Sequence, residues 1–149
     1  MDTFKRASGV VLVVMAIVVA VHTVVEPLYY TSTEANPYSP VWDVLGWLML
    51  VPLALGVLFG WLRKRDSERA GSGSAMTREI VAANTHFYGG SFLGIMFLWN
   101  WFNQISPGFT AIGSDTVALV WILLDAALPL LWVTMGMFLL CGDCDRSGA

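Results

Sequence analysis

Charged residues are scarce in this chain, and their scarcity excludes an ordinary water-soluble domain. Asp, Glu, Lys and Arg make up 13% of the 149 residues and 56% are apolar, whereas soluble domains average about 25% charged residues. Charges are absent from residues 7–25, 44–62 and 80–105, and the stretch 116–142 contains only Asp125. Because about 20 apolar residues cross the hydrocarbon core of a bilayer, the sequence predicts an all-α integral membrane protein with four transmembrane helices.

The predicted helices leave only short connections. We expect one four-helix transmembrane domain over residues 1–149, with helices at about 7–30, 42–62, 80–104 and 116–141. The connection 63–79 is basic at first and then Gly/Ser-rich, and residues 142–149 form a tail. No connecting segment is long enough to fold alone, so a functional site must lie among the helices or at their ends.

Basic residues are absent from two of the three connections. All eight Lys and Arg residues precede the first helix, lie in the 63–79 loop or follow the fourth helix. The positive-inside rule therefore predicts that both termini and this loop are cytoplasmic and that the helices cross the plasma membrane. A cleaved signal peptide is the alternative for the N-terminus, but the apolar run passes the small residue Ala20 and continues to Val25.

Cysteine is also scarce, which excludes a disulfide-stabilised fold. Cys141 and Cys144 form a CGDC sequence at the predicted cytoplasmic end, where a structural disulfide is not expected and where one Cys pair cannot fill a tetrahedral zinc site. We therefore expect an inert tail. The chain lacks a phosphate-binding glycine loop and a nucleophile–base pattern, so we do not expect it to be an enzyme on its own or to bind nucleic acid.

The few polar residues inside the apolar stretches are the candidates for function. A carboxylate at a helix centre costs about 2.5–3.5 kcal/mol on insertion scales, and Pro129 leaves the Asp125 carbonyl without its helical donor. His22 and Glu26 are one turn apart in VHTVVEP, and His22 lies at the height of Asp125, ~24 Å from the cytoplasmic end. We predict that His22, Glu26, Asn100 and Asp125 gather in the outer half of the bundle. The alternative is that a neutral Asp125 only packs, and that Glu26 marks the helix end.

The second histidine, His86, belongs to an inner level, only ~12 Å from the cytoplasmic end. This difference in height from His22 argues against a haem ligated by both histidines. A transition metal held by His22, Glu26 and Asp125 is an alternative, because imidazole and carboxylates suit iron, copper or zinc. The signal is weak, since the sequence has no dense histidine cluster.

Glycine and aromatic residues indicate how the helices pack. Two GxxxG pairs allow close backbone approach, one formed by Gly56 and Gly60 and the other by Gly90 and Gly94. Trp and Tyr residues gather in the predicted outer half. They are typical of an aromatic belt at the headgroups, and a surface that contacts a ligand or a protein is the alternative. This set comprises Tyr29, Tyr30, Tyr38, Trp42, Trp47, Trp99, Trp101 and Trp121.

Three functions fit these features. Small size and the GxxxG faces favour a non-catalytic accessory or assembly subunit of a larger membrane complex, surrounded by lipid and bound to other membrane subunits. The first alternative is an oligomeric proton or cation transporter or channel that uses Asp125 with His22. The second is a membrane metal-site protein in an oxidoreductase complex.

Overall fold

The chain folds into helices. The computed structural model describes residues 2–33, 36–69, 76–106 and 113–141, in which α1 (Asp2–Tyr29), α2 (Val41–Arg69), α3 (Met76–Asn84), the π-helical turn η1 (Thr85–Gly89), α4 (Gly90–Ile105) and α5 (Ser114–Cys141) follow in order. The all-α prediction is confirmed, and α1, α2 and α5 are long and apolar enough to cross a membrane. The third predicted span consists of α3, η1 and α4, which continue one another without a break from residue 76 to residue 105.

The connection predicted at 63–79 is mostly helical, which corrects the expected helix end. Helix α2 continues to Arg69, and α3 begins at Met76. Lys64 and Glu68 form an ion pair one turn apart on α2, and such a pair stabilises an exposed helix. Sequence periodicity missed this extension because the added turns are charged rather than apolar. The Gly/Ser-rich residues 70–75 and the tail 142–149, with Cys144, lie outside the described residues.

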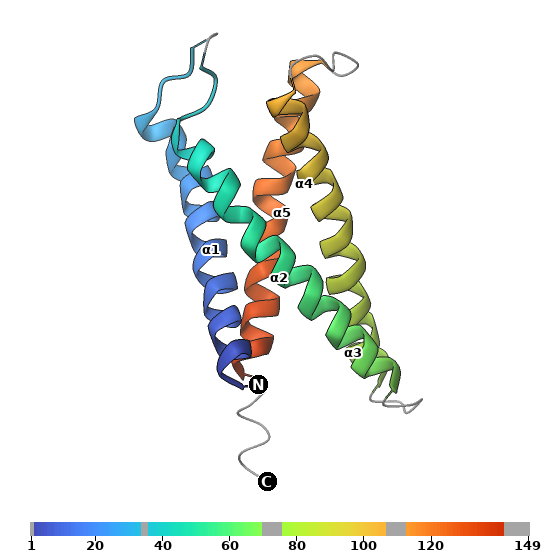
Figure 1. Cartoon of the computed structure of the whole chain (residues 1–149). Helices are drawn as coiled ribbons and strands as arrows, with labels where there is room; N and C mark the ends of the chain where they lie inside the picture. The colour runs from blue at the N-terminus through green and yellow to red at the C-terminus, as the bar shows by residue number, and fades with distance from the viewer. Residues whose placement is uncertain (1, 34–35, 70–75, 107–112, 142–149) are drawn as a thin grey trace.

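The helices exchange neighbours along the length of the bundle. We call the end where α1 begins and α5 finishes the terminal end, and the opposite end the loop end. Figure 1 shows α2 crossing α5, so that α1 lies beside α5 at the terminal end and beside α2 at the loop end. Helix α4 lies beside α5 at the loop end, and α3 lies beside α2 at the terminal end.

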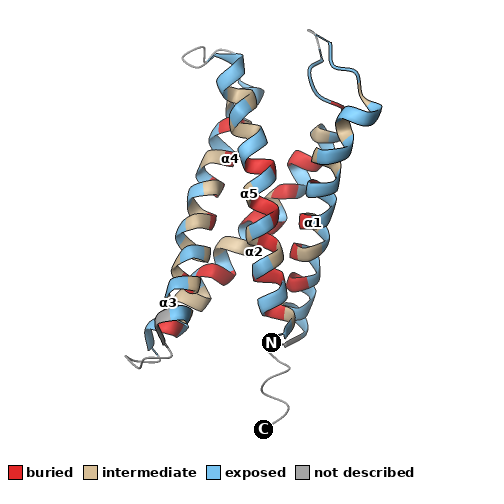
Figure 2. Ribbon diagram, turned by 180° about the vertical axis from the view of Figure 1, so that it is seen from behind, coloured by how far each residue is buried: buried red, intermediate tan, exposed pale blue. Residues whose placement is uncertain are grey.

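A narrow apolar core runs along the crossing. Figure 2 shows the buried residues on the inward surfaces of the helices, while the outward surfaces are exposed. Exposed aliphatic side chains such as Leu28 and Leu123 cover those outward surfaces, as expected where lipid replaces water. The buried core consists of Leu12, Ala16, Val19, Met49, Leu53, Phe59, Phe97, Leu124, Leu128, Trp132, Met135 and Leu139.

The closest helix contact joins α1 and α5 at the terminal end. A Cβ on Gly136 would lie 2.8 Å from the Gly9 carbonyl oxygen, and a Cβ on Gly9 would lie 3.0 Å from the Gly136 carbonyl oxygen. The first distance is shorter than real Cβ contacts and the second is tighter than most of them, so a Cβ on Gly136 would force the two helices apart. Neither glycine belongs to a GxxxG pair.

The predicted GxxxG residues pack inside the chain. A Cβ on Gly60 would lie 3.2 Å from the His86 carbonyl carbon in the π-helical turn, and one on Gly56 would lie 3.5 Å from Trp132. Gly94 faces Leu53, and Gly90 faces Val57 at a looser 3.9 Å. These glycines therefore join α2 to the third helix and to α5 within one chain.

Candidate functional site

A large cavity separates the helix pairs at the loop end. Its volume is about 1000 Å³, and its walls come from the ends of α1 and α4, the start of α2, the first half of α5 and residues of the 30–40 connection. The cavity exists because the α1–α2 pair and the α4–α5 pair diverge toward this end (Figure 1). A much smaller void of about 10 Å³ lies near the middle of the bundle beside His86, with room for about one water molecule.

The charged residues described on the cavity wall are all acidic. Glu26, Asp43 and Asp125 line it, and no Lys, Arg or His is found among the described residues of the lining. Asp125 is only 8% exposed, and its Oδ1 atom is buried without a hydrogen-bond partner in the described part of the chain. A buried carboxylate oxygen without a partner is costly. Four other buried polar atoms of the described residues also lack a partner, but of these five residues only Asp125 belongs to the cavity lining.

The carboxylate of Glu26 is held in place by the loop and by α2. Its Oε1 accepts a hydrogen bond of 2.7 Å from the Ser39 backbone N–H, and its Oε2 accepts one of 2.7 Å from Trp42 Nε1. These bonds tie the end of α1 to the start of α2. Helix α1 continues through Pro27 to Tyr29, so Glu26 does more than mark a helix end.

His22 does not bond to Asp125. Its Nδ1 lies 3.2 Å from the Tyr29 hydroxyl, and its ring packs against Trp42 with centroids 4.6 Å apart. His22 is absent from the cavity lining, although its buried Nε2 has no partner among the described residues. The structure therefore brings Glu26, rather than His22, to the cavity that Asp125 lines.

Aromatic side chains form much of the remaining wall. Trp47 meets Trp101 edge to face, with centroids 4.6 Å apart. Trp121 meets the buried Phe97 edge to face at 5.4 Å, which fixes α5 against α4. Six of the eight aromatic residues predicted for this half line the cavity, namely Tyr30, Tyr38, Trp42, Trp47, Trp101 and Trp121.

The 30–40 connection contributes Tyr38 to the cavity wall. Burial raises the pKa of Tyr38 above its usual value, and the negative charges of Asp125 and Glu26 raise it further. Tyr38 lines the same cavity as both carboxylates.

Asn100 serves a different purpose from the one predicted. It is fully buried, and its Nδ2 donates a hydrogen bond of 3.2 Å to the Val117 carbonyl oxygen. This bond joins α4 to the first half of α5. Asn100 is absent from the cavity lining, whereas Gln104, one turn further along α4, is present.

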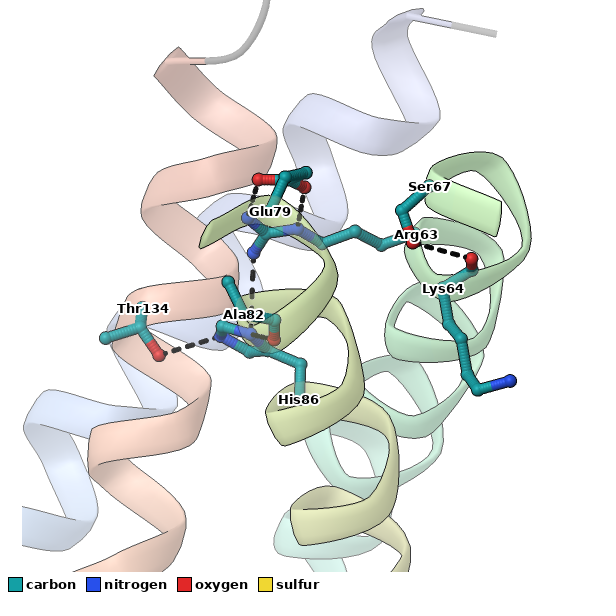
Figure 3. Close-up of polar contacts among 7 residues, drawn as sticks. All are labelled: Arg63, Lys64, Ser67, Glu79, Ala82, His86 and Thr134. Carbon is teal, nitrogen blue, oxygen red and sulfur yellow. Dashed lines mark hydrogen bonds and ion pairs between the residues drawn. The ribbon is translucent and has the colours of Figure 1, made fainter. Parts of the chain in front are cut away.

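A second polar cluster occupies the terminal end (Figure 3). Arg63 donates to both oxygens of Glu79, through Nε at 2.7 Å and Nη2 at 2.8 Å. The guanidinium also lies over the Phe138 ring, 3.8 Å from its centroid. This bidentate geometry is the strong form of an Arg–carboxylate pair, and it joins α2, α3 and α5.

His86 lies in the π-helical turn within this cluster. Its Nδ1 is 2.7 Å from the Ala82 carbonyl oxygen, which can only accept, so Nδ1 donates there. Its Nε2 lies 3.0 Å from the Thr134 hydroxyl of α5. His86 is absent from the cavity lining that contains Asp125, and nothing in the sequence indicated the π-helical turn. Such turns are frequent at functional sites.

The predicted metal site is not assembled. No three His, Cys, Asp or Glu side chains among the described residues are close enough to hold one metal ion. His22 interacts with Tyr29 and Trp42, away from the wall that Asp125 and Glu26 share. Cys141 is exposed and unpaired at the end of α5.

The fold and the site together define a class: a helical membrane protein with a carboxylate-lined cavity at one end. No family model, curated protein or solved structure matches the chain.

Proposed function

We propose that this chain is a small membrane protein that binds and moves a cation, with Asp125 and Glu26 as its charged groups. The observation that carries the proposal is the place of Asp125, a buried acidic residue, in the lining of an acidic cavity. Glu26 takes the place predicted for His22, because Glu26 lines the cavity and His22 does not.

The side of the cavity that faces the terminal end is closed, which supports a carrier rather than an open pore. Leu53, Leu128 and Trp132 are buried in the core between the cavity and the terminal end, so no described cavity joins the two ends. A carrier exposes its site to each side in turn. Pro129 in α5 and the π-helical turn η1 interrupt regular helix near this boundary, and such interruptions are common points of bending.

The membrane arrangement is part of this proposal. We place residues 80–105, from α3 through η1 to the end of α4, as a fourth span, with Glu79 just outside it, and we place the basic terminal end in the cytoplasm. A single cysteine introduced at Thr33 into a Cys141→Ser, Cys144→Ser chain should react with a membrane-impermeant maleimide outside intact cells. A cysteine at Ser72 should react only after lysis. The reverse pattern contradicts this orientation.

Flux measurements test the proposed activity. Purified protein in liposomes should pass protons or monovalent cations down an imposed gradient, and Asp125→Asn should abolish that flux. The matched control is Asp115→Asn, the same change on the same helix at an exposed first-turn residue outside the cavity. Equal flux in wild type and Asp125→Asn would exclude Asp125 as the carrier.

The second candidate function is that of an assembly subunit in a larger membrane complex, and the volume of the cavity favours it. A space of about 1000 Å³ between two helix pairs can receive large side chains from a partner subunit. Extraction in a mild detergent should then yield the chain with different membrane proteins in a fixed ratio. Recovery as a pure monomer or homo-oligomer argues against this candidate and leaves cation binding in place.

A further inference from the structure

The three carboxylates of the cavity are spread over its wall. Glu26 is on α1, Asp43 is in the first turn of α2, and Asp125 is near the middle of α5. They do not form a group of three that could hold one metal ion. Carboxylates that are spread apart cannot coordinate one small metal ion together. They are better suited to a larger organic cation.

The carboxylates of the cavity differ in how they are held by their neighbours. Glu26 is fixed by Ser39 and Trp42 and cannot swing toward Asp125 without losing two short hydrogen bonds. Asp125 lines the cavity without such bonds, and its Oδ1 atom is enclosed by the protein. The nearest basic cluster, around Arg63, is at the terminal end and does not line the cavity. No described residue on the cavity wall is basic, so the described wall has net negative charge.

Besides the carboxylates, aromatic side chains of the cavity wall can contact a bound cation. Trp42, Trp47, Trp101 and Trp121 come from three different helices and line the same space, with Tyr30 and Tyr38 beside them. Aromatic faces attract ammonium cations, and Trp does so best. Aromatic rings offer no comparable advantage to a proton or a hydrated inorganic ion.

The volume of the cavity indicates how large a bound organic cation can be. The volume of about 1000 Å³ is at the upper end of the range for small-molecule sites, about 300–1,000 Å³. We propose that this cavity binds an ammonium group carried on an apolar body, with Asp125 facing the charge and the tryptophans surrounding it. This inference rests on the proposed cation-binding function and names its ligand class. A free organic amine and a choline or ethanolamine headgroup of a lipid share this chemistry.

Equilibrium dialysis of the full chain tests the inference. The protein is placed in phosphatidylglycerol nanodiscs with radiolabelled benzyltrimethylammonium, and unlabelled neopentylbenzene, its neutral carbon isostere, is the competitor. We expect saturable binding that the neutral isostere does not displace. Sodium and magnesium chloride at matched ionic strength should displace the probe equally and only weakly, because neither ion uses the aromatic wall.

Two matched pairs of variants assign the binding to the cavity. Asp125→Asn should weaken binding by about tenfold or more, whereas Asp115→Asn should leave it unchanged. Trp101→Leu should weaken binding by about fivefold, whereas Trp99→Leu, outside the cavity lining, should not. Each variant is first compared with wild type by circular dichroism and melting temperature, and Trp101→Phe replaces Trp101→Leu if the latter does not fold.

A lipid arm distinguishes the two sources of the ammonium group. If a headgroup occupies the cavity, phosphatidylcholine added to the nanodiscs should compete with the probe in wild type. If the occupant is a free amine, phosphatidylcholine should have no effect on probe binding. Either result supports the proposed ligand chemistry.

Other outcomes overturn it. Displacement by neopentylbenzene as effective as by the unlabelled ammonium would mean that the cavity recognises only apolar bodies. Absence of saturable probe binding, together with cation flux that depends on Asp125, would reject the ammonium ligand and leave the proposed function intact. Absence of both would reject both.

Discussion

At the terminal end the Arg63 guanidinium lies 2.7–2.8 Å from both oxygens of Glu79, and at the loop end Asp125 Oδ1 has no partner among the described residues. The two ends also differ in packing. Gly9 and Gly136 bring α1 and α5 into backbone contact at the terminal end, whereas a cavity of about 1000 Å³ separates the helix pairs at the loop end. The comparison indicates that close packing and an ion pair close the terminal end, whereas the loop end is open, and we propose that the open end binds a ligand.

The largest effect should follow from filling the closest helix contact. Gly136→Ala places a Cβ 2.8 Å from the Gly9 carbonyl oxygen, so α1 and α5 must separate. We expect a loss of about 3 kcal/mol, at the upper end of the usual range for overpacking, measured by thermal unfolding in detergent. The control at the loop end is Gly46→Ala, whose Cβ would meet only the Trp101 side chain, at 3.5 Å. Equal destabilisation by both changes would remove the distinction between the ends.

Two carboxylate-to-amide changes compare the acidic residues within the loop end. Both oxygens of Glu26 accept from N–H donors, so Glu26→Gln turns an NH₂ group toward a donor and should cost about 2 kcal/mol. Asp125→Asn breaks no bond at Oδ1 and should cost less than the ~1 kcal/mol of a typical substitution. Melting temperatures check both values, and a larger loss for Asp125→Asn would contradict this account of Asp125.

A double-mutant cycle measures the ion pair at the terminal end. Arg63→Ala, Glu79→Ala and their combination should give a coupling free energy of about 1 kcal/mol, because the Arg63 side chain is only 10% exposed, although that of Glu79 is 46% exposed. The exposed pair Lys64–Glu68 on α2 is the control, and we expect its coupling to be smaller, because solvent screens exposed charges. A coupling near zero for Arg63 and Glu79 would show that packing alone closes this end.

Acid should affect the terminal end through the same pair. The hydrogen bonds from Arg63, and then its positive charge, hold the pKa of Glu79 below its usual value, against the opposing effect of burial. Since the folded pKa is the lower one, the pair stabilises the fold above the unfolded pKa of about 4.3, and this contribution is lost as the pH falls through the folded pKa. The melting temperature of wild type should therefore decrease more below about pH 4.3 than that of Glu79→Gln. Parallel pH profiles would contradict the assignment.

The helical membrane fold could be predicted from the sequence because its cause is local. Each apolar stretch is long enough to cross a bilayer, and a helix satisfies its own backbone hydrogen bonds there. Asp125 could also be found, since a carboxylate within such a stretch is costly wherever it faces. The end of α2 was missed because its last turns are charged and depend on contacts such as Arg63–Glu79.

The composition of the site could not be predicted in the same way. Depth along the helix predicts that His22 is level with Asp125, but depth says nothing of rotation about the helix axis. That rotation turns Glu26 toward the cavity. Ser39 of the 30–40 connection and Trp42 of α2 then hold its carboxylate by hydrogen bonds. The GxxxG pattern likewise finds glycines one turn apart on one helix, and it misses Gly9 and Gly136, which are single glycines on two helices.

The sequence by itself determined that the chain is helical, apolar enough for a membrane and equipped with a buried carboxylate, because hydrophobicity and the cost of a buried charge belong to individual residues and their neighbours. Only the tertiary structure decided that α2 crosses α5, that the terminal end closes and that the loop end opens around Glu26 and Asp125. Crossing angles and helix rotations arise from the packing of side chains far apart in the sequence, and that packing is a property of the assembled helices.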